Sequence, residues 1–277
     1  MKVVVKLMGG LGNQMFQFAI GKKISLKYNK KLILDKTFLL RRDLDITYRN
    51  FDLNIFNIDN EIVEDFVVTN DYEILEEPLM SPNMTDNINI INNEKNIYVS
   101  GFFQKEYYFN DIRTQILKDF ELTIQDDYIK KLESDILSSN SICINVRRGD
   151  YVTNQNTNNF HGFHGVEYIN NSISEITKKI KTPMFYIFSD DIEWCVENLK
   201  INYPHFFVDH TYKGNKFSSY LKLMSSCKNF IIPNSTFAWW ATWLNQNEQK
   251  IVYVPKNWLN VNYVNTDGLI PLSWNKL

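Results

Sequence analysis

The second half of the chain alternates between short apolar runs and segments with helical periodicity, and this alternation constrains the fold most. Apolar runs typical of buried strands lie at 142–146, 184–188, 229–232 and 250–254. Apolar residues at helical spacing predict helices over 166–179, 192–199, 216–226 and 236–245. Strands that alternate with helices form a parallel sheet covered on both faces, so the pattern predicts a doubly wound α/β domain.

The first half opens with a strand, a glycine turn and a helix, which is the start of a second unit of this kind. Periodicity predicts strands at 2–8, 31–35 and 97–101, and helices over 14–28, 106–120 and 124–137. The segment 37–96 has weak periodicity, and we expect loops and short strands there. Because 277 residues suffice for two such units, we place the domains at 1–138 and 139–277.

Composition narrows the classes of partner. With 44% hydrophobic and 22% charged residues and a net charge of −2, the chain is ordinary for a globular protein, and nothing in its bulk charge predicts nucleic acid as a partner. No apolar run reaches the ~18 residues of a membrane span. Cys143, Cys195 and Cys227 are odd in number and widely spaced, which predicts buried, reduced thiols and a cytoplasmic location.

Four polar motifs follow predicted strands, where ligands of parallel sheets usually bind. The first is the loop Gly9-Gly10-Leu11-Gly12-Asn13-Gln14, in which Gly10, Gly12 and the first turn of the next helix bring backbone N–H groups toward a phosphate or sugar. The Asn13 side chain can hydrogen-bond a ligand directly. A plain strand-to-helix turn is the alternative interpretation, since the third glycine of the nicotinamide fingerprint is replaced by Met15.

The second motif places two adjacent arginines, Arg147 and Arg148, after the strand at 142–146, ahead of Gly149 and Asp150. Neighbouring side chains on extended backbone point in opposite directions, so one guanidinium faces inward and needs an anion. Its fixed fork of donors suits a diphosphate. A structural ion pair with Asp150 is the alternative.

The third and fourth motifs are acidic and hydroxyl-bearing. In Ser189-Asp190-Asp191 one aspartate is expected to cap the following helix, which leaves the other, Asp190, to accept from a nucleoside. Ser235 and Thr236 precede an apolar helix, so they either cap it or hold an anion at its N-terminus. We expect the helix's tryptophans to belong to the core. Asp43 and Asp45 have the spacing of metal-binding acids but are interpreted as surface charge.

Together, the four motifs resemble the bacterial α-1,2-fucosyltransferase family. The resemblance rests on residues 9–17, 146–151, 188–191 and 234–240 in this order, and extends from residue 3 to about 258. It implies a glycosyltransferase B fold of two Rossmann-like domains facing a cleft, with 1–138 on the acceptor side and 139–277 binding the donor. The implied reaction moves L-fucose from GDP-fucose to the 2-hydroxyl of a terminal galactose, with inversion and without a metal or other cofactor.

The resemblance also implies roles for residues. It places Arg147 on the donor phosphates, where a cation stabilises the leaving group, with Arg148 and Asp150 ordering it. Gly10, Gly12, Asn13, Asp190, Ser235 and Thr236 complete the expected donor site. No general base can be singled out, although Asp150, His164 and Glu167 are chemically able. The acceptor is expected to be a galactose-terminated cell-surface glycan, which suggests loose association with the inner face of the membrane.

One position departs from the family pattern, which usually begins the arginine motif with His where this chain has Asn145. An amide can donate a hydrogen bond but cannot carry a charge. The departure predicts weaker donor binding or compensation by His161 or His164, which are otherwise solvent-exposed loop residues. It also keeps open a catalytically silent glycan-binding protein, alongside an NAD(P)-dependent oxidoreductase and a metal-dependent transferase that uses Asp43 and Asp45.

Overall fold

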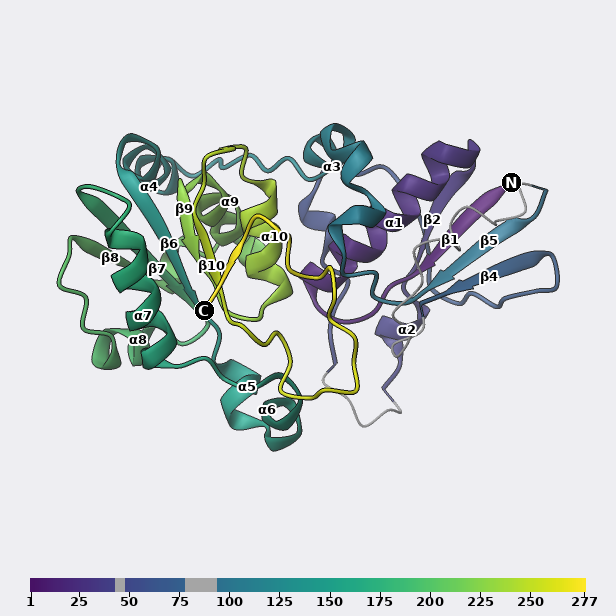
Figure 1. The fold of residues 1–277 in the computed structure, drawn as a ribbon. Coiled ribbons are helices and arrows are strands. Elements are labelled where there is room, and N and C mark those ends of the chain that lie inside the picture. Colours follow the sequence, from purple (N-terminus) through teal and green to yellow (C-terminus); the bar gives the residue numbers. More distant parts are fainter. Residues whose placement is uncertain (43–47, 78–93) are drawn as a thin grey trace. The chain divides into compact units, whose positions relative to one another are not determined.

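The computed structural model describes residues 1–42, 48–77 and 94–277, which form two compact units. The first unit holds Met1–Glu121 and Tyr263–Pro271, and the second holds Leu122–Asn262 and Leu272–Leu277. Each unit is built on its own parallel sheet (Figure 1). The α/β fold class predicted from the alternation is therefore confirmed.

The first unit has a five-stranded sheet in the order β3-β2-β1-β5-β4, and every pairing in it is parallel. The strands are β1 (Lys2–Lys6), β2 (Lys31–Asp35), β3 (Glu61–Val63), β4 (Tyr72–Glu76) and β5 (Asn96–Ser100). The helices are α1 (Leu11–Tyr28), α2 (Thr37–Leu40) and α3 (Arg113–Asp119), with single 3₁₀ turns at Leu53–Ile55, Glu106–Tyr108 and Asn110–Ile112. The helix predicted over 106–120 is thus two 3₁₀ turns followed by α3.

Helix α1 packs closely on β1 because Gly21 has no side chain. A Cβ atom at Gly21 would collide with Val5 of β1 and Leu32 of β2. Phe16, Phe18 and Ile20 of the same helix are completely buried. The close contact fixes the helix against the sheet and, with it, the loop that leads from β1 into α1.

The second unit has a six-stranded parallel sheet in the order β11-β10-β9-β6-β7-β8. Its strands are β6 (Asn140–Val146), β7 (Pro183–Ser189), β8 (His205–Val208), β9 (Asn229–Ile231), β10 (Val252–Val254) and β11 (Asn275–Lys276). Its helices are α4 (Asp127–Ser138), α5 (Gly149–Thr153), α6 (Gln155–His161), α7 (Val166–Thr177), α8 (Ile192–Asn198), α9 (Ser218–Ser226) and α10 (Thr236–Leu244). Two 3₁₀ turns lie at His210–Tyr212 and Asn215–Phe217.

Helices cover both faces of this second sheet. Figure 1 shows α7 and α8 on one side of β6 and β7, with α4 on the other. On the first side, Ile142 and Ile144 of β6 share a buried cluster with Ile173 of α7 and Cys195 of α8. Trp239 and Trp240 of α10 are fully buried, as expected for core tryptophans. All three cysteines are free and buried, which matches the prediction of reduced thiols.

The chain divides after Glu121, whereas we placed the boundary at 138. The difference is helix α4, which belongs to the second unit. Its Glu133 accepts a hydrogen bond from the Ser226 hydroxyl at 2.9 Å and lies 3.4 Å from the Lys222 ammonium, and both partners are on α9. Amphipathic periodicity locates such a helix but does not show which sheet its apolar face covers. Among the described residues, no helix combines the length and apolarity needed to cross a membrane.

Candidate active site in the second unit

The site lies where the order of the second sheet reverses. Strand β6 is the first strand of this sheet along the chain and pairs with β7 on one side and β9 on the other. The segments after these strands therefore leave their carboxyl ends side by side, which is the usual ligand position in an open parallel sheet. The arginine, aspartate and serine motifs of the sequence follow β6, β7 and β9 respectively.

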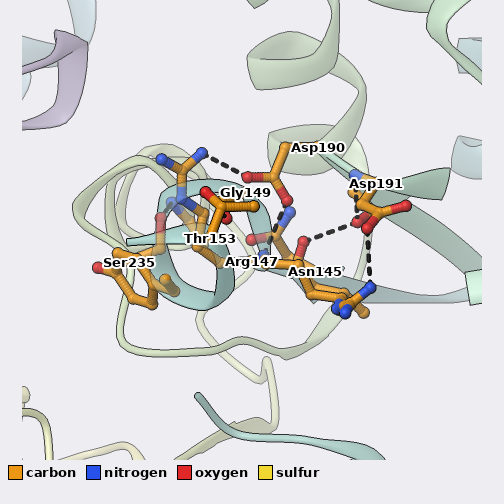
Figure 2. Close-up of polar contacts among 12 residues, drawn as sticks. Asn145, Arg147, Gly149, Thr153, Asp190, Asp191 and Ser235 are labelled. Carbon is orange, nitrogen blue, oxygen red and sulfur yellow. Dashed lines mark hydrogen bonds and ion pairs between the residues drawn. The ribbon is translucent and has the colours of Figure 1, made fainter. Parts of the chain in front are cut away.

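The two arginines after β6 pair with the two aspartates after β7 (Figure 2). The Nη1 atom of Arg147 lies 2.7 Å from Oδ2 of Asp190, and Nη1 of Arg148 lies 2.8 Å from Oδ2 of Asp191. The backbone N–H of Arg148 also donates to Oδ1 of Asp190 at 2.9 Å. The structure thus brings Arg147, Arg148 and Asp190 together, and the partners of the arginines are the aspartates of β7.

The two guanidinium groups occupy different surroundings. Arg147 lies over the ring of Tyr151, 5.5 Å from its centre, and its side chain is 30% exposed. Arg148 lies 4.3 Å from the ring centre of Trp194 and 5.6 Å from that of Phe163, and its side chain is 17% exposed. Arg148 therefore connects α8 to the loop before α7, while Arg147 is the more accessible cation.

Gly149 makes room for Asp190. A Cβ atom at Gly149 would lie 2.5 Å from Oδ2 of Asp190, which is well inside van der Waals contact. Any side chain at this position would displace the carboxylate that pairs with Arg147. The glycine between the arginines and Asp150 is therefore needed for the geometry of the ion pair, and not for a positive φ angle.

Asp191 caps the next helix, as expected for one aspartate of the pair. Its Oδ1 accepts from the backbone N–H of Trp194 at 3.2 Å in the first turn of α8. Asp190 is the second member, and in this structure it interacts with both arginines. Its assignment to the nucleoside remains a prediction.

The segment after β9 is linked to the arginine segment by a buried hydrogen bond. The Tyr151 hydroxyl donates to the carbonyl of Asn234 at 3.0 Å. Ser235 is the N-cap of α10 and accepts from the backbone N–H of Ala238 at 3.5 Å, a long capping bond. Thr236 is half-buried in the first turn. The capping interpretation of Ser235 is thus confirmed, and anion binding at this helix start remains a prediction.

His161 and His164 are both packed into the unit, unlike the solvent-exposed loop histidines of the alternative interpretation. The His161 ring stacks on Tyr151 at 4.8 Å, and its backbone carbonyl accepts from the Asn234 side chain at 2.7 Å. The Nε2 atom of His164 is buried without a hydrogen-bond partner in the described part of the chain. Burial lowers the pKa of His164, and a hydrogen bond to the backbone of Asn257 partly offsets this effect.

Asn145 fills the position where the family pattern has His. Its side chain is half-buried in the unit and donates to the carbonyl of Phe188 on β7 at 3.2 Å. The amide therefore bridges two strands of the sheet near the ion pairs. A histidine at this position would start from the same place beside the end of β7.

The glycine loop of the first unit is organised by two buried glutamines. The Gln14 amide donates to the carbonyls of Gly9 and Asn50 at 2.9 and 2.7 Å, and Oε1 of Gln17 accepts from the backbone N–H of Met8 at 2.9 Å. Gly10 is the N-cap of α1 and provides no side-chain cap. Gly12 and Asn13 lie in the first turn of that helix. The structure describes this loop and the arginine cluster in separate units.

Some predicted residues fall outside the description. The side chain of Asp150 is not among the described ones, and Asp43 and Asp45 lie in the segment 43–47, outside the described residues. Within the described ranges, no three His, Cys, Asp or Glu side chains gather in a way that could hold a metal ion.

Sequence reasoning missed two side chains that shape these sites. Trp194 stacks with Arg148, and Gln104, after β5, donates from Nε2 to Oδ1 of Asn13 at 2.9 Å. The position of Gln104 directly after a strand was the available signal, since polar residues at strand ends frequently contact ligands.

Comparison with known proteins places the chain in a family. The model of the family described as glycosyl transferase family 11 matches residues 1–277. The chain belongs to glycosyl transferase family 11. This membership makes it a glycosyltransferase, and it removes the oxidoreductase alternative.

Two Escherichia coli relatives of this glycosyltransferase match over nearly their whole length. The O-antigen biosynthesis glycosyltransferase WbnK is 32% identical over 97% of this chain and 98% of its own. The α-1,2-colitosyltransferase is 32% identical over 98% and 97%. The rat galactoside α-(1,2)-fucosyltransferase 1 is 25% identical over 53% of this chain and 41% of its own.

Solved structures share the fold at low sequence identity. The NodZ α-1,6-fucosyltransferase co-crystallised with GDP has a TM-score of 0.54 and 13% identity over 87% of this chain and 91% of its own. POFUT1 in complex with GDP-fucose has a TM-score of 0.52 and 13% identity over 90% and 95%. These neighbours support the glycosyltransferase B fold class expected from the resemblance.

Proposed function

We propose that this family 11 glycosyltransferase transfers L-fucose from GDP-fucose to the 2-hydroxyl of a terminal galactose, with inversion and without a metal ion. The names of the relatives support α-1,2 transfer in O-antigen biosynthesis and on galactosides. The complexes of the structural neighbours with GDP and GDP-fucose support a guanosine diphosphate sugar as donor. No nucleic acid is part of this function, and no cofactor besides the donor substrate.

The observation that carries the proposal is the position of Arg147. It is the more accessible guanidinium, it stands at the reversal of strand order, and an ion pair with Asp190 fixes its direction. A guanidinium presents five donors in a rigid fork that matches two phosphate oxygens. Arg147 can therefore keep one donor on Asp190 and direct others to a diphosphate.

The chemistry asks the protein to stabilise the charge that builds on the departing GDP. The fucosyl group passes through an oxocarbenium-like state while negative charge grows on the β-phosphate. Fixed cations and helix N-termini aimed at that charge lower the barrier because they need no reorganisation during the reaction. Arg147 and the start of α10 at Ser235 and Thr236 are assigned this role, and Arg148 and Asp150 are assigned to ordering Arg147.

The acceptor hydroxyl has to lose a proton when it attacks the opposite face of the sugar. His164 is neutral near pH 7 because burial lowers its pKa, so it has a lone pair to accept one. Its Nε2 atom is nevertheless buried, which argues for a positioning role unless the loop around it opens. A dissociative transition state reduces the need for a strong base, since the proton leaves late.

We assign the donor to the second unit and the acceptor to the first. The acceptor is a galactose-terminated glycan of the cell surface, built in the cytoplasm at the inner face of the membrane. Colitose is the second candidate for the transferred sugar, because the α-1,2-colitosyltransferase is as similar as WbnK, with 32% identity.

A transfer assay tests the proposal. The purified protein is incubated with methyl β-galactoside and GDP-fucose or GDP-colitose, with a chelator present, and the product is analysed by NMR. The expected product from GDP-fucose shows an α-fucosyl anomeric proton correlated with C2 of galactose. A product from GDP-colitose alone would replace the donor, linkage to another carbon would overturn the regiochemistry, and activity lost to the chelator and restored by a divalent ion would overturn metal independence.

A further inference from the structure

The turn that follows β5 is held rigidly by contacts on both sides. The backbone N–H groups of Phe102 and Phe103 donate to Oε2 of Glu77 at 2.9 and 2.5 Å. On the other side, the Gln17 amide of α1 donates to the carbonyl of Gly101 at 3.2 Å. Phe103 is 1% exposed and has a positive φ of 50°, which a non-glycine residue adopts only where its surroundings enforce it.

This rigid turn presents Gln104 to the glycine loop. The Gln104 Nε2 atom donates to Oδ1 of Asn13 at 2.9 Å, across 91 residues of sequence. The absence of a side chain at Gly9 leaves space for the Asn13 amide, because a Cβ atom there would collide with Nδ2 of Asn13. Two loops, one after β1 and one after β5, are thus joined through a single pair of amides at neighbouring strand ends.

The shared hydrogen bond leaves one donor and one acceptor. Within the described residues, Nδ2 of Asn13 and Oε1 of Gln104 make no other hydrogen bond. Two amides joined by one hydrogen bond always retain an NH₂ group on one partner and a C=O group on the other. A hydroxyl both donates and accepts, so the pair is complementary to the hydroxyls of a sugar. A phosphate has only acceptors and would be repelled by the open carbonyl.

We propose that Asn13 and Gln104 form a sugar-binding subsite of the first unit, in which the open amide N–H donates to a sugar oxygen and the open carbonyl accepts from a sugar hydroxyl. The inference rests on the proposed function and deepens it, since the sugar is either the fucosyl group of the donor or the galactose of the acceptor. Gln104 is a specificity-determining residue in this account, and Glu77 and Gln17 keep its turn in place.

The test compares two variants of the pair with a matched control. Gln104→Ala removes the carbonyl and the support of Asn13, whereas Asn13→Asp can still accept from Gln104 but loses its open N–H group. Gln115→Ala is the control, because Gln115 is also half-buried in the first unit and donates from Nε2 to Asp119 at 2.7 Å within α3. Thermal unfolding of all three shows that they are folded.

Calorimetric affinities for GDP and GDP-fucose and the KM for methyl β-galactoside distinguish the sources of the sugar. If the pair binds the fucosyl group, both variants weaken GDP-fucose about fivefold to tenfold and leave GDP unchanged, as expected for one neutral hydrogen bond. If it binds the acceptor, the same factor falls on the galactoside KM. Gln115→Ala changes none of these quantities.

Two results would overturn the subsite. In the first, the pair variants behave like Gln115→Ala. In the second, GDP and GDP-fucose weaken equally, which would assign the amides to the nucleotide. Failure of the proposed function is recognised separately, because the wild-type protein then neither binds GDP-fucose nor transfers fucose. In that case saturation-transfer NMR with free L-fucose and methyl β-galactoside decides: a signal lost in Gln104→Ala supports the subsite, and an absent or unchanged signal refutes it.

Discussion

Replacing Arg147 by alanine is expected to abolish most transfer while leaving the protein folded. The variant removes two charge-assisted hydrogen bonds to the diphosphate, worth about 1.5–3 kcal/mol each, or about 3–6 kcal/mol together. Since about 1.4 kcal/mol corresponds to a factor of ten, kcat/KM should fall by roughly 10²–10⁴. The loss belongs to transition-state stabilisation, because the charge on the phosphate grows as the sugar departs.

The cost to folding is much smaller. The ion pair of Arg147 and Asp190 joins side chains that are 30% and 19% exposed, so solvent screens it, and such pairs contribute about 0–1 kcal/mol. Asp190 also keeps its hydrogen bond from the Arg148 backbone in the variant. We therefore expect the midpoint of thermal unfolding to fall by no more than about 2–4 °C.

The assay is steady-state transfer from GDP-fucose to methyl β-galactoside, with thermal unfolding of each preparation. Arg147→Lys is the matched variant: it keeps the charge but loses the planar fork, so its rate should lie between those of the wild type and the alanine variant. A folded Arg147→Ala protein with wild-type kcat/KM would refute the assignment of this arginine to the diphosphate.

Three further predictions follow from contacts in the second unit. Gly149→Ala should lower transfer at least tenfold without removing a charge, because the added Cβ would lie 2.5 Å from the Asp190 carboxylate; wild-type activity would mean that the ion-pair geometry is unimportant. Tyr151→Phe removes the buried hydrogen bond to the Asn234 carbonyl and should lower the unfolding free energy by about 1–3 kcal/mol in a denaturant titration, whereas an unchanged midpoint would contradict the structural role of the hydroxyl. Because the pKa of His164 is lowered from its ordinary value of 6.5, its stabilising contribution is complete above pH 6.5 and is lost as pH falls toward the folded-state pKa, so His164→Gln should lose less stability than the wild type between about pH 7 and 5, and parallel pH profiles would contradict this.

Much of the second unit follows from the sequence because its strands are long apolar runs. The strands at 142–146 and 184–188 and the helices over 192–199 and 236–245 were predicted close to their observed bounds. Strand β8 (His205–Val208) was missed because four residues are too few for a periodic signal.

Helices α5 and α6 show where local propensity is insufficient. The segment 149–161 is rich in Asn and Thr, which are weak helix formers, and its helices are stabilised by contacts made elsewhere in the unit. The Asn158 amide donates to the carbonyl of Tyr151 at 2.6 Å, and Tyr151 in turn donates to Asn234. Partners 83 residues apart cannot be deduced from a local pattern.

The candidate site was predicted by residue type but not by pairing. Strand-end position was sufficient to select Arg147, Arg148 and Asp190, because parallel strands bring their carboxyl ends together. It could not show that each arginine pairs with an aspartate of the next strand, nor that Gln104 contacts Asn13. Such pairings depend on strand order and register, which the sequence does not state.

Calorimetric titration of the purified protein with GDP-fucose, GDP-mannose and NADH, with a chelator present throughout, tests the central claim most directly. The account predicts saturable heat with GDP-fucose and much weaker heat with GDP-mannose, whose sugar differs, and none with NADH. Silence toward both GDP-sugars, or tighter binding of GDP-mannose than of GDP-fucose, would contradict the assignment of this glycosyltransferase to fucosyl transfer.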